Sequence, residues 1–275
     1  MKNRSSVRIL DCTMRDGGYA NQWRFDKKLV REVYRALSKA GVDYVEVGFH
    51  GTPKYFDPKE NGLWRFSPEK DIREVCANIH GAKLALMLDF GKFDLNAIPN
   101  RKDSVVSLIR LASHRDEITP SLNVLRKLQR KGYEVSLQAM GYTGYSQSER
   151  REFAAMLKGS GMDFAYIADT YGSMFPQDIE RLFTPLLKQR EVKIGFHPHN
   201  SLQMAFANSI EAIRCGVDIV DSSLFGMGRG AGNLCTEIIL AYLHERLPDR
   251  FNVIPALECI DKYFVRMQKE IGWGY

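Results

Sequence analysis

Two histidines separated by one residue are the first side chains whose spacing could support chemistry. His197 and His199 follow the apolar residues 192–194. Side chains two apart on a strand point to the same face, so both imidazoles would project together and could bind one divalent cation. Pro198 cannot donate a ladder hydrogen bond, so we expect the strand to end there. Alone, such a pair is equally typical of polar residues at a loop mouth.

Polar side chains also stand at or near the ends of most other predicted strands. They are Asp11, Cys12, Thr13, Arg15, Asp16, Tyr19, Glu46, Asp89, Ser136, Gln138, Asp169, Thr170, Ser222 and Ser223. Any one of them alone is usually a structural cap or a solvated loop end. If the strands close into a barrel, their carboxyl ends meet, and these side chains predict one shared site.

A carboxylate beside the two imidazoles would complete a three-ligand cation site with open coordination positions. We choose Asp16 over Asp11, because Asp11 still lies within its predicted strand and is better placed to brace the loop. Oxygen and nitrogen ligands together suit Mn²⁺ or Mg²⁺, with Co²⁺ or Zn²⁺ as further choices. Such a cation could hold a chelating substrate.

Eight apolar runs that alternate with helix-like segments predict the fold. The predicted strands are residues 7–11, 43–49, 82–88, 104–111, 134–140, 164–170, 192–197 and 219–224. The predicted helices are residues 26–40, 68–78, 119–131, 147–158, 176–188, 202–214 and 233–246. Near-continuous apolar strands are typical of a parallel sheet buried on both faces, so we predict an α/β fold, a (β/α)8 TIM barrel. An open doubly wound sheet is the alternative.

We expect a catalytic barrel over residues 1–247 and a C-terminal helical extension over residues 248–275. The chain of 275 residues, 44% of them hydrophobic, is long enough for one barrel core. In a predicted helix over residues 256–271, an apolar stripe should pack on the barrel or across a homodimer contact. Its members are Leu257, Ile260, Phe264 and Met267. The aromatic residues Trp273 and Tyr275 indicate an anchored end.

Composition restricts the class of protein. The net charge of +6 and the pI near 9.0 suit anionic substrates, but Lys and Arg are spread among acids, unlike in a nucleic-acid binder. The five cysteines are far apart and form no Cys-x-x-Cys pair, which predicts free thiols in a reducing cytoplasm. Residues 1–8 lack the apolar core of a signal peptide, and no run is long enough for a membrane helix. We therefore expect a soluble protein without a membrane partner.

Two loops are open to more than one interpretation. Residues 50–66 form either a substrate-covering loop or a long connection. Residues 226–231 match the glycine pattern of dinucleotide-binding loops, but they follow the last strand and no βαβ unit comes after them. For residues 226–233 we therefore expect close backbone approach to an anion or to the metal site.

Several of these motifs together resemble the metal-dependent aldolase, lyase and acyltransferase barrels, a family that includes 4-hydroxy-2-oxovalerate aldolase and HMG-CoA lyase. The resemblance covers about residues 7–245 and is greatest to the aldolase branch. It rests on residues 11–17, 44–48, 169–172, 197–200, 207–210 and 220–233.

The resemblance implies roles for individual residues. It implies that Arg15 polarises a carbonyl and that Glu46 supports Arg15. The implied metal ligands are Asp16, His197 and His199, with Asn233 as the fourth ligand of the lyase branch. Two positions depart from the family: Tyr19 replaces a histidine that the aldolases use for proton transfer, and Met227 replaces a loop cysteine of HMG-CoA lyase.

We therefore predict a divalent-metal-dependent aldolase or lyase that makes or breaks a carbon–carbon bond next to a 2-oxo acid of the pyruvate type. Arg15 stays charged, so it can stabilise an enolate but cannot act as the base. Tyr19, a hydroxide on the metal or Asp169 must take the proton, and position favours Tyr19.

Two other functions remain open. One is a Claisen-type acyl-CoA transferase or lyase of the same family, which would need a long nucleotide-binding groove. The other is a regulatory barrel without catalysis, which the intact set of Arg15, Asp16, His197 and His199 disfavours. The resemblance also implies a C-terminal domain that docks an aldehyde dehydrogenase. Because only residues 248–275 follow the eighth βα unit, we expect a homodimer that needs no dehydrogenase partner.

Overall fold

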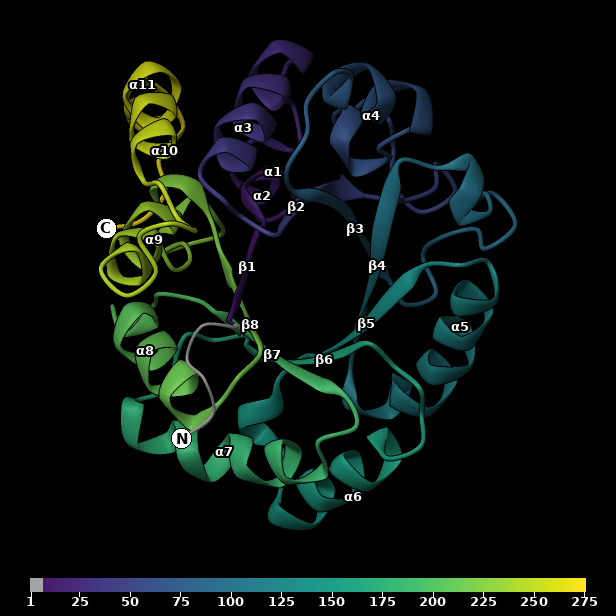
Figure 1. Cartoon of the computed structure of the whole chain (residues 1–275). Helices are drawn as coiled ribbons and strands as arrows, with labels where there is room; N and C mark the ends of the chain where they lie inside the picture. Colours follow the sequence, from purple (N-terminus) through teal and green to yellow (C-terminus); the bar gives the residue numbers. More distant parts are fainter. Residues whose placement is uncertain (1–6) are drawn as a thin grey trace.

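Eight parallel strands close into a barrel in chain order, β1 to β8, in the computed structural model, which describes residues 7–275 (Figure 1). They are β1 (Arg8–Asp11), β2 (Tyr44–Phe49), β3 (Lys83–Asp89), β4 (Val106–Ser113), β5 (Glu134–Ala139), β6 (Phe164–Asp169), β7 (Lys193–Pro198) and β8 (Ile219–Ser222). Because β1 pairs with β8, the predicted TIM barrel is confirmed and the open sheet is excluded. Residues 1–6 of the segment examined for a signal peptide lie outside the described residues.

The helices surround the barrel (Figure 1). Those between strands are α1 (Thr13–Asp16), α2 (Gly18–Asn21), α3 (Lys27–Lys39), α4 (Glu69–Cys76), α5 (Ile118–Arg130), α6 (Gln147–Leu157), α7 (Pro176–Gln189) and α8 (Ala205–Cys215). After β8 come α9 (Thr236–His244), α10 (Ile254–Cys259), the π-helical turn η7 (Ile260–Phe264) and α11 (Val265–Ile271). Short 3₁₀ turns are η2 (Leu63–Arg65), η3 (Arg101–Asp103), η4 (Arg115–Glu117), η5 (Tyr142–Gly144) and η6 (Leu224–Gly226).

Most predicted elements agree with the structure to within a few residues at each end. The cap of α3 shows why: the side chain of Asp26 accepts a hydrogen bond from the backbone N–H of Leu29 at 2.8 Å, and this fixes where the helix begins. The helices α1 and α2 were not predicted. Between β3 and β4 the described chain has only η3 and no α-helix.

The inside of the barrel changes from apolar to charged toward the carboxyl ends of the strands. A buried cluster separate from the outer core contains Leu10, Tyr44, Ala85, Leu108, Phe164 and Ile219. Because side chains two apart share a face, the residues two positions further along β2, β4 and β8 also point inward. These residues are Glu46, Arg110 and Asp221, each at most 1% exposed. The sequence therefore places a charged layer directly above an apolar one.

The C-terminal segment packs on the barrel. The helix α10 contacts α3 and α9, and the side chains of Ile260 and Phe264 are buried, whereas Leu257 stays 44% exposed. The indole Nε1 of Trp273 donates to the carbonyl of Phe225 at 3.0 Å. The chain end is thus anchored on the connection after β8. The division into a barrel and an extension stays a prediction, and no helix among residues 7–275 is long and apolar enough to cross a membrane.

Candidate metal and catalytic site

The loop after β1 turns inward over the barrel and carries Asp16 and Arg15 on α1. The carboxylate of Asp11 accepts a hydrogen bond from the backbone N–H of Thr13 at 2.9 Å, and Thr13 Oγ1 accepts one from Leu224 N at 2.8 Å. These bonds tie the first turn of the loop to β1 and to the connection after β8. Asp16 is 2% exposed and Arg15 6% exposed, so both charges lie in the interior. Asp11 therefore braces the loop, as predicted.

Both histidines at the end of β7 are held through Nδ1. His197 Nδ1 donates to the carboxylate of Asp221 at 2.9 Å, and His199 Nδ1 donates to the backbone carbonyl of Asp169 at 2.9 Å. Since these acceptors bind an N–H, the lone pair of each imidazole is on Nε2. His199 Nε2 lies 3.7 Å from Asp16 Oδ2, and His197 Nε2 is buried without a hydrogen-bond partner.

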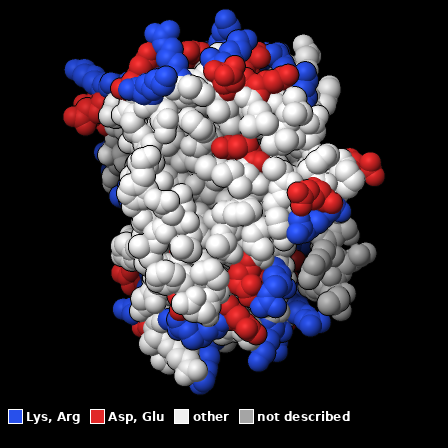
Figure 2. All heavy atoms as spheres, turned by 90° about the vertical axis from the view of Figure 1, so that its left-hand side faces the viewer, with Lys and Arg blue, Asp and Glu red and all other residues white. Residues whose placement is uncertain are grey.

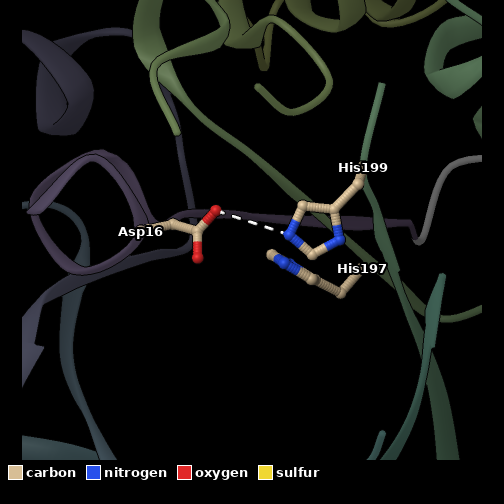
Figure 3. A group of neighbouring side chains, drawn as sticks. All are labelled: Asp16, His197 and His199. Carbon is tan, nitrogen blue, oxygen red and sulfur yellow. Dashed lines mark ion pairs between the residues drawn. The ribbon is translucent and has the colours of Figure 1, made fainter. Parts of the chain in front are cut away.

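The three predicted ligands meet at one point. Figure 3 shows Asp16 facing the two imidazoles, with the dashed line joining Asp16 to His199. One donor atom from each of Asp16, His197 and His199 lies within 4.8 Å of the other two. A buried carboxylate with two imidazole lone pairs aimed toward it is a donor set that fits a divalent cation.

Asn233 adds a fourth donor to this group. Its Nδ2 donates to Asp16 Oδ2 at 2.6 Å and to the carbonyl of Met227 at 3.2 Å, which leaves Oδ1 buried without a partner. The glycine-rich loop 226–233 comes close to the site, because a Cβ atom at Gly228 would lie 3.0 Å from Asp16 Oδ2. The loop therefore approaches Asp16, a predicted metal ligand, through its backbone.

Arg15 is fixed by two carboxylates. Its Nε donates to Glu46 Oε2 at 2.7 Å, and its Nη1 pairs with Asp16. Burial alone would raise the pKa of the Asp16 carboxyl, but Arg15 and the two histidines outweigh it and hold that pKa well below its ordinary value. Asp16 is therefore ionised at any working pH, as a metal ligand must be.

Two members of a charged layer below Arg15, Arg110 and Asp221, were missed by the sequence analysis, whereas the third, Glu46, was predicted. Arg110 donates to Glu46 Oε2 at 3.0 Å, pairs with Asp221 and lies over the ring of Tyr166 at 4.5 Å. Arg110 thus joins Glu46, which holds Arg15, to Asp221, which holds His197. The available signal was a single arginine within the apolar residues 106–112, where an inward charge needs buried partners.

Tyr19 and Asp169, the other predicted site residues, differ in exposure, because Tyr19 reaches the surface and Asp169 is buried. Tyr19 on α2 is 42% exposed and makes edge contacts with the rings of Trp23 and Phe49. The carboxylate of Asp169 accepts hydrogen bonds from the backbone N–H groups of Ser173 and Met174, each at 3.0 Å. Asp169 therefore shapes its own loop and presents its carbonyl to His199.

Fold and site together define a class of protein, a (β/α)8 barrel in which Asp16, His197 and His199 could hold a cation beside a buried arginine at the carboxyl ends of the strands. Residues 6–259 match the family model described as HMGL-like, and the chain belongs to this family. It is 33% identical over 261 residues to a 4-hydroxy-2-oxovalerate aldolase from Geobacillus genomosp. 3. This alignment covers 94% of this chain and 77% of that relative.

Two further similarities agree with this family. The chain is 29% identical over 238 residues to an oxaloacetate decarboxylase from Mycobacterium tuberculosis, covering 86% of this chain and 70% of the relative. A crystal structure of the N-terminal domain of a protein classed as an aldolase, from Bacteroides vulgatus, superimposes with a TM-score of 0.83 at 28% identity. That superposition covers 98% of this chain and 89% of the other.

Proposed function

We propose that this chain is a divalent-metal-dependent lyase of the aldolase type, which makes or breaks a carbon–carbon bond next to the carbonyl group of a 2-oxo acid. The observation that carries the proposal is the unpartnered Nε2 of His197 beside the carboxylate of Asp16, with Arg15 paired to the same carboxylate. The similarity to a hydroxy-oxovalerate aldolase and to an oxaloacetate decarboxylase supports it, because both named substrates are 2-oxo acids.

The cation would be held by Asp16, His197 and His199, with Asn233 Oδ1 as a fourth donor. We propose Mn²⁺ or Mg²⁺, with Co²⁺ or Zn²⁺ as further candidates, since the set combines oxygen and nitrogen donors. When bound, the cation supplies a Lewis acid for the keto and carboxylate oxygens of the substrate.

Arg15 would stabilise the negative charge of the enolate. Glu46 and Asp16 occupy Nε and Nη1, whereas Nη2 makes no hydrogen bond to any residue from 7 to 275. A fixed guanidinium whose Nη2 is free can donate to the oxygen on which charge develops. Glu46 positions this donor and is itself held by Arg110.

Tyr19 would act in its protonated form. The ordinary pKa of tyrosine is 10 and the shift at Tyr19 is upward, so the phenol keeps its proton at neutral pH. We therefore assign Tyr19 as the donor that gives a proton to the enolate carbon in the direction of cleavage. The carboxylate of Asp169, which is occupied by two backbone N–H groups, is assigned a positioning role.

Proton exchange of pyruvate tests this function without knowledge of the aldehyde. With Mn²⁺ present in D₂O, the isolated chain should exchange the methyl protons of pyruvate, followed by NMR, and should release pyruvate from a 4-hydroxy-2-oxo acid or from oxaloacetate. The same assay tests whether turnover needs a dehydrogenase partner. A wild-type protein that binds metal but neither exchanges pyruvate nor releases it from any tested 2-oxo acid would contradict the proposal.

Matched variants separate the roles of metal and arginine. His197→Ala should lose most bound Mn²⁺ and the exchange activity, whereas His80→Ala, which removes an exposed histidine, should keep both. Arg15→Lys should lower kcat by about 10²-fold or more with little change in Tm, because an ammonium cannot reproduce the guanidinium fork. Undiminished metal in His197→Ala would show that the site is assigned wrongly.

We also propose a homodimer formed through the exposed faces of α8 and α9. Figure 2 shows a broad surface with few charged side chains on the side where these helices lie. Phe206 is 37% exposed and Ile238 44% exposed, and the ring of Phe206 contacts Tyr242. An apolar face of this kind is typical of a subunit contact. Sedimentation of the wild type as a dimer and of Ile238→Asp as a monomer would support this, and a monomeric wild type would contradict it.

A cytoplasmic location is proposed from the thiols. The five cysteines are all free. Free thiols are typical of a reducing compartment. Fractionation of cells that express the full protein would test this.

A further inference from the structure

One arginine stands at the exposed turn of the glycine-rich loop over the site. Arg229 follows Gly228, whose added Cβ would lie 3.0 Å from Asp16 Oδ2, so this turn passes directly beside a proposed metal ligand. The guanidinium carbon of Arg229 lies 5.6 Å from the centroid of the Tyr19 ring. Arg229 follows β8, whereas Tyr19 lies on α2 after β1. The two side chains therefore lie beside each other at the entrance to the site.

Arg229 has no charged partner. Its guanidinium makes no ion pair and no hydrogen bond to any residue in the described part of the chain. The buried arginines of the site differ, because Arg15 and Arg110 each contact two carboxylates. A cation left unpaired at an entrance is free to bind an anion and raises the local concentration of anionic substrates.

A second arginine lies in the aromatic wall that Tyr19 contacts. Arg65 on η2 is 3% exposed, and its guanidinium carbon lies 4.0 Å from the centroid of the Phe49 ring. The same ring lies 5.9 Å from the guanidinium carbon of Arg15 and 6.2 Å from the ring of Tyr19. Arg65 is thus close to both the proposed catalytic arginine and the proposed proton donor.

Two hydrogen-bond donors of the Arg65 side chain have no acceptor. Its Nη2 pairs with Asp89, but Nε and Nη1 are buried and have no hydrogen-bond partner. A buried donor left without an acceptor destabilises the protein. An anionic group that reaches this wall would satisfy them with charge-assisted hydrogen bonds, which are stronger than neutral ones.

We propose that Arg229 and Arg65 form a subsite for a second anionic group, so that the aldehyde joined to or released from the 2-oxo acid itself carries a carboxylate or a phosphate. This inference rests on the proposed function, in which the carboxylate of the 2-oxo acid is bound at the cation site. An uncharged aldehyde would leave the guanidinium of Arg229, and the Nε and Nη1 donors of Arg65, without an acceptor. The subsite therefore sets the specificity for the second substrate, with Arg229 at the entrance and Arg65 in the wall.

Pairs of aldehydes that differ in one anionic group test the subsite. The Mn²⁺-loaded chain is assayed for condensation of pyruvate with succinic semialdehyde against butanal, and with glyceraldehyde 3-phosphate against glyceraldehyde. We expect kcat/KM to be at least about tenfold higher for the charged member of one pair, and that pair identifies the group as carboxylate or phosphate. This preference should fall as ionic strength rises.

Two variants test whether Arg229 and Arg65 cause the preference for the charged aldehyde. Arg229→Gln should lower kcat/KM for the preferred charged aldehyde by about tenfold or more, with a much smaller change for its neutral partner. Arg65→Lys, which keeps the charge but loses Nε and Nη1, should raise KM for the charged aldehyde more than it lowers kcat. Arg246→Gln, which changes an exposed arginine on the ring of Tyr242, is the control and should behave like the wild type.

Exchange of the pyruvate methyl protons separates two kinds of failure. No exchange by the wild type would contradict the proposed function. Exchange with equal or better use of the neutral aldehydes would overturn the subsite alone, and so would an equal loss for both members of a pair in Arg229→Gln.

Discussion

Asp221 accepts a hydrogen bond from His197 Nδ1 at 2.9 Å, and the same carboxylate oxygen is paired with Arg110. Arg110 donates in turn to Glu46, which accepts from Nε of Arg15 at 2.7 Å. A proposed metal ligand and the proposed catalytic arginine are therefore joined by one buried series of charged contacts. A change at its centre should affect both ends.

The first prediction concerns metal affinity. Asp221→Asn keeps an oxygen that can accept from His197 but removes the negative charge that makes the imidazole a better ligand. We expect the affinity for Mn²⁺ to fall by about 10- to 100-fold, as measured by calorimetric titration. Asp249→Asn removes an exposed carboxylate and serves as the control. Equal dissociation constants for Asp221→Asn and the wild type would show that Asp221 does not tune the ligand.

The second prediction concerns stability. Arg110→Met would leave the carboxylate of Asp221 buried without its arginine and would leave Glu46 with Arg15 as its one remaining counter-charge. Breaking a buried pair in this way costs about 3–5 kcal/mol, which urea unfolding would measure. Arg126→Met, at an exposed position, should change stability by no more than about 0.5 kcal/mol. A loss in Arg110→Met no larger than in this control would mean that the charged layer does not hold the barrel together.

The strands and the cation ligands could be predicted because their signals are local. Each strand is marked by its own apolar run, whatever its neighbours are. The alternation of side chains alone places His197 and His199 on one face, and the structure brings both to Asp16. The barrel then follows from the repeated order of strand and helix.

Apart from Glu46, the charged layer could not be assigned from the sequence, because its members are far apart in the chain. Arg110 and Asp221 are separated by 111 positions, and which inward positions meet depends on closure and register. Local distortions were also missed. The short helices α1 and α2 carry no strong periodic signal, and the helix predicted over residues 256–271 is interrupted by the π-helical turn η7.

The third prediction concerns the stability gained by filling a cavity beside the connection from β3 to β4, which has no α-helix. A cavity of about 260 Å³ is lined by Val106, Leu88, Ile72 and Pro99, among others, where η3 alone joins β3 to β4. Val106→Ile would place one more carbon in it and should raise the free energy of unfolding by about 0.8 kcal/mol. Urea unfolding would measure this.

A second valine provides the control for the cavity. Val135 is fully buried on β5 and does not line the cavity. Val135→Ile should overpack the core and lower stability by about 1–3 kcal/mol. Losses of similar size in the two variants would mean that the cavity cannot accept another methyl group.

The fourth prediction concerns pH and rests on Asp11. The carboxyl group is fully buried, and burial raises its pKa from the ordinary value of 3.8 to about 6, although hydrogen bonds from Thr13 and Thr236 oppose the shift. Because the pKa in the folded state lies above that in the unfolded state, the folded protein binds this proton more tightly. Its contribution to stability is therefore complete below about pH 4 and is lost as the pH rises through about 6.

Between pH 5 and pH 8 the wild type should lose about 1 kcal/mol through this group. Asp11→Asn cannot ionise, so its stability relative to the wild type should improve by about the same amount over this range, whatever its stability at pH 5. Urea unfolding of both proteins at the two pH values measures the change, with the exposed Asp249→Asn expected to show none. If Asp11→Asn instead loses stability relative to the wild type as the pH rises, the pKa of Asp11 in the folded protein lies below its unfolded value, and the prediction is wrong.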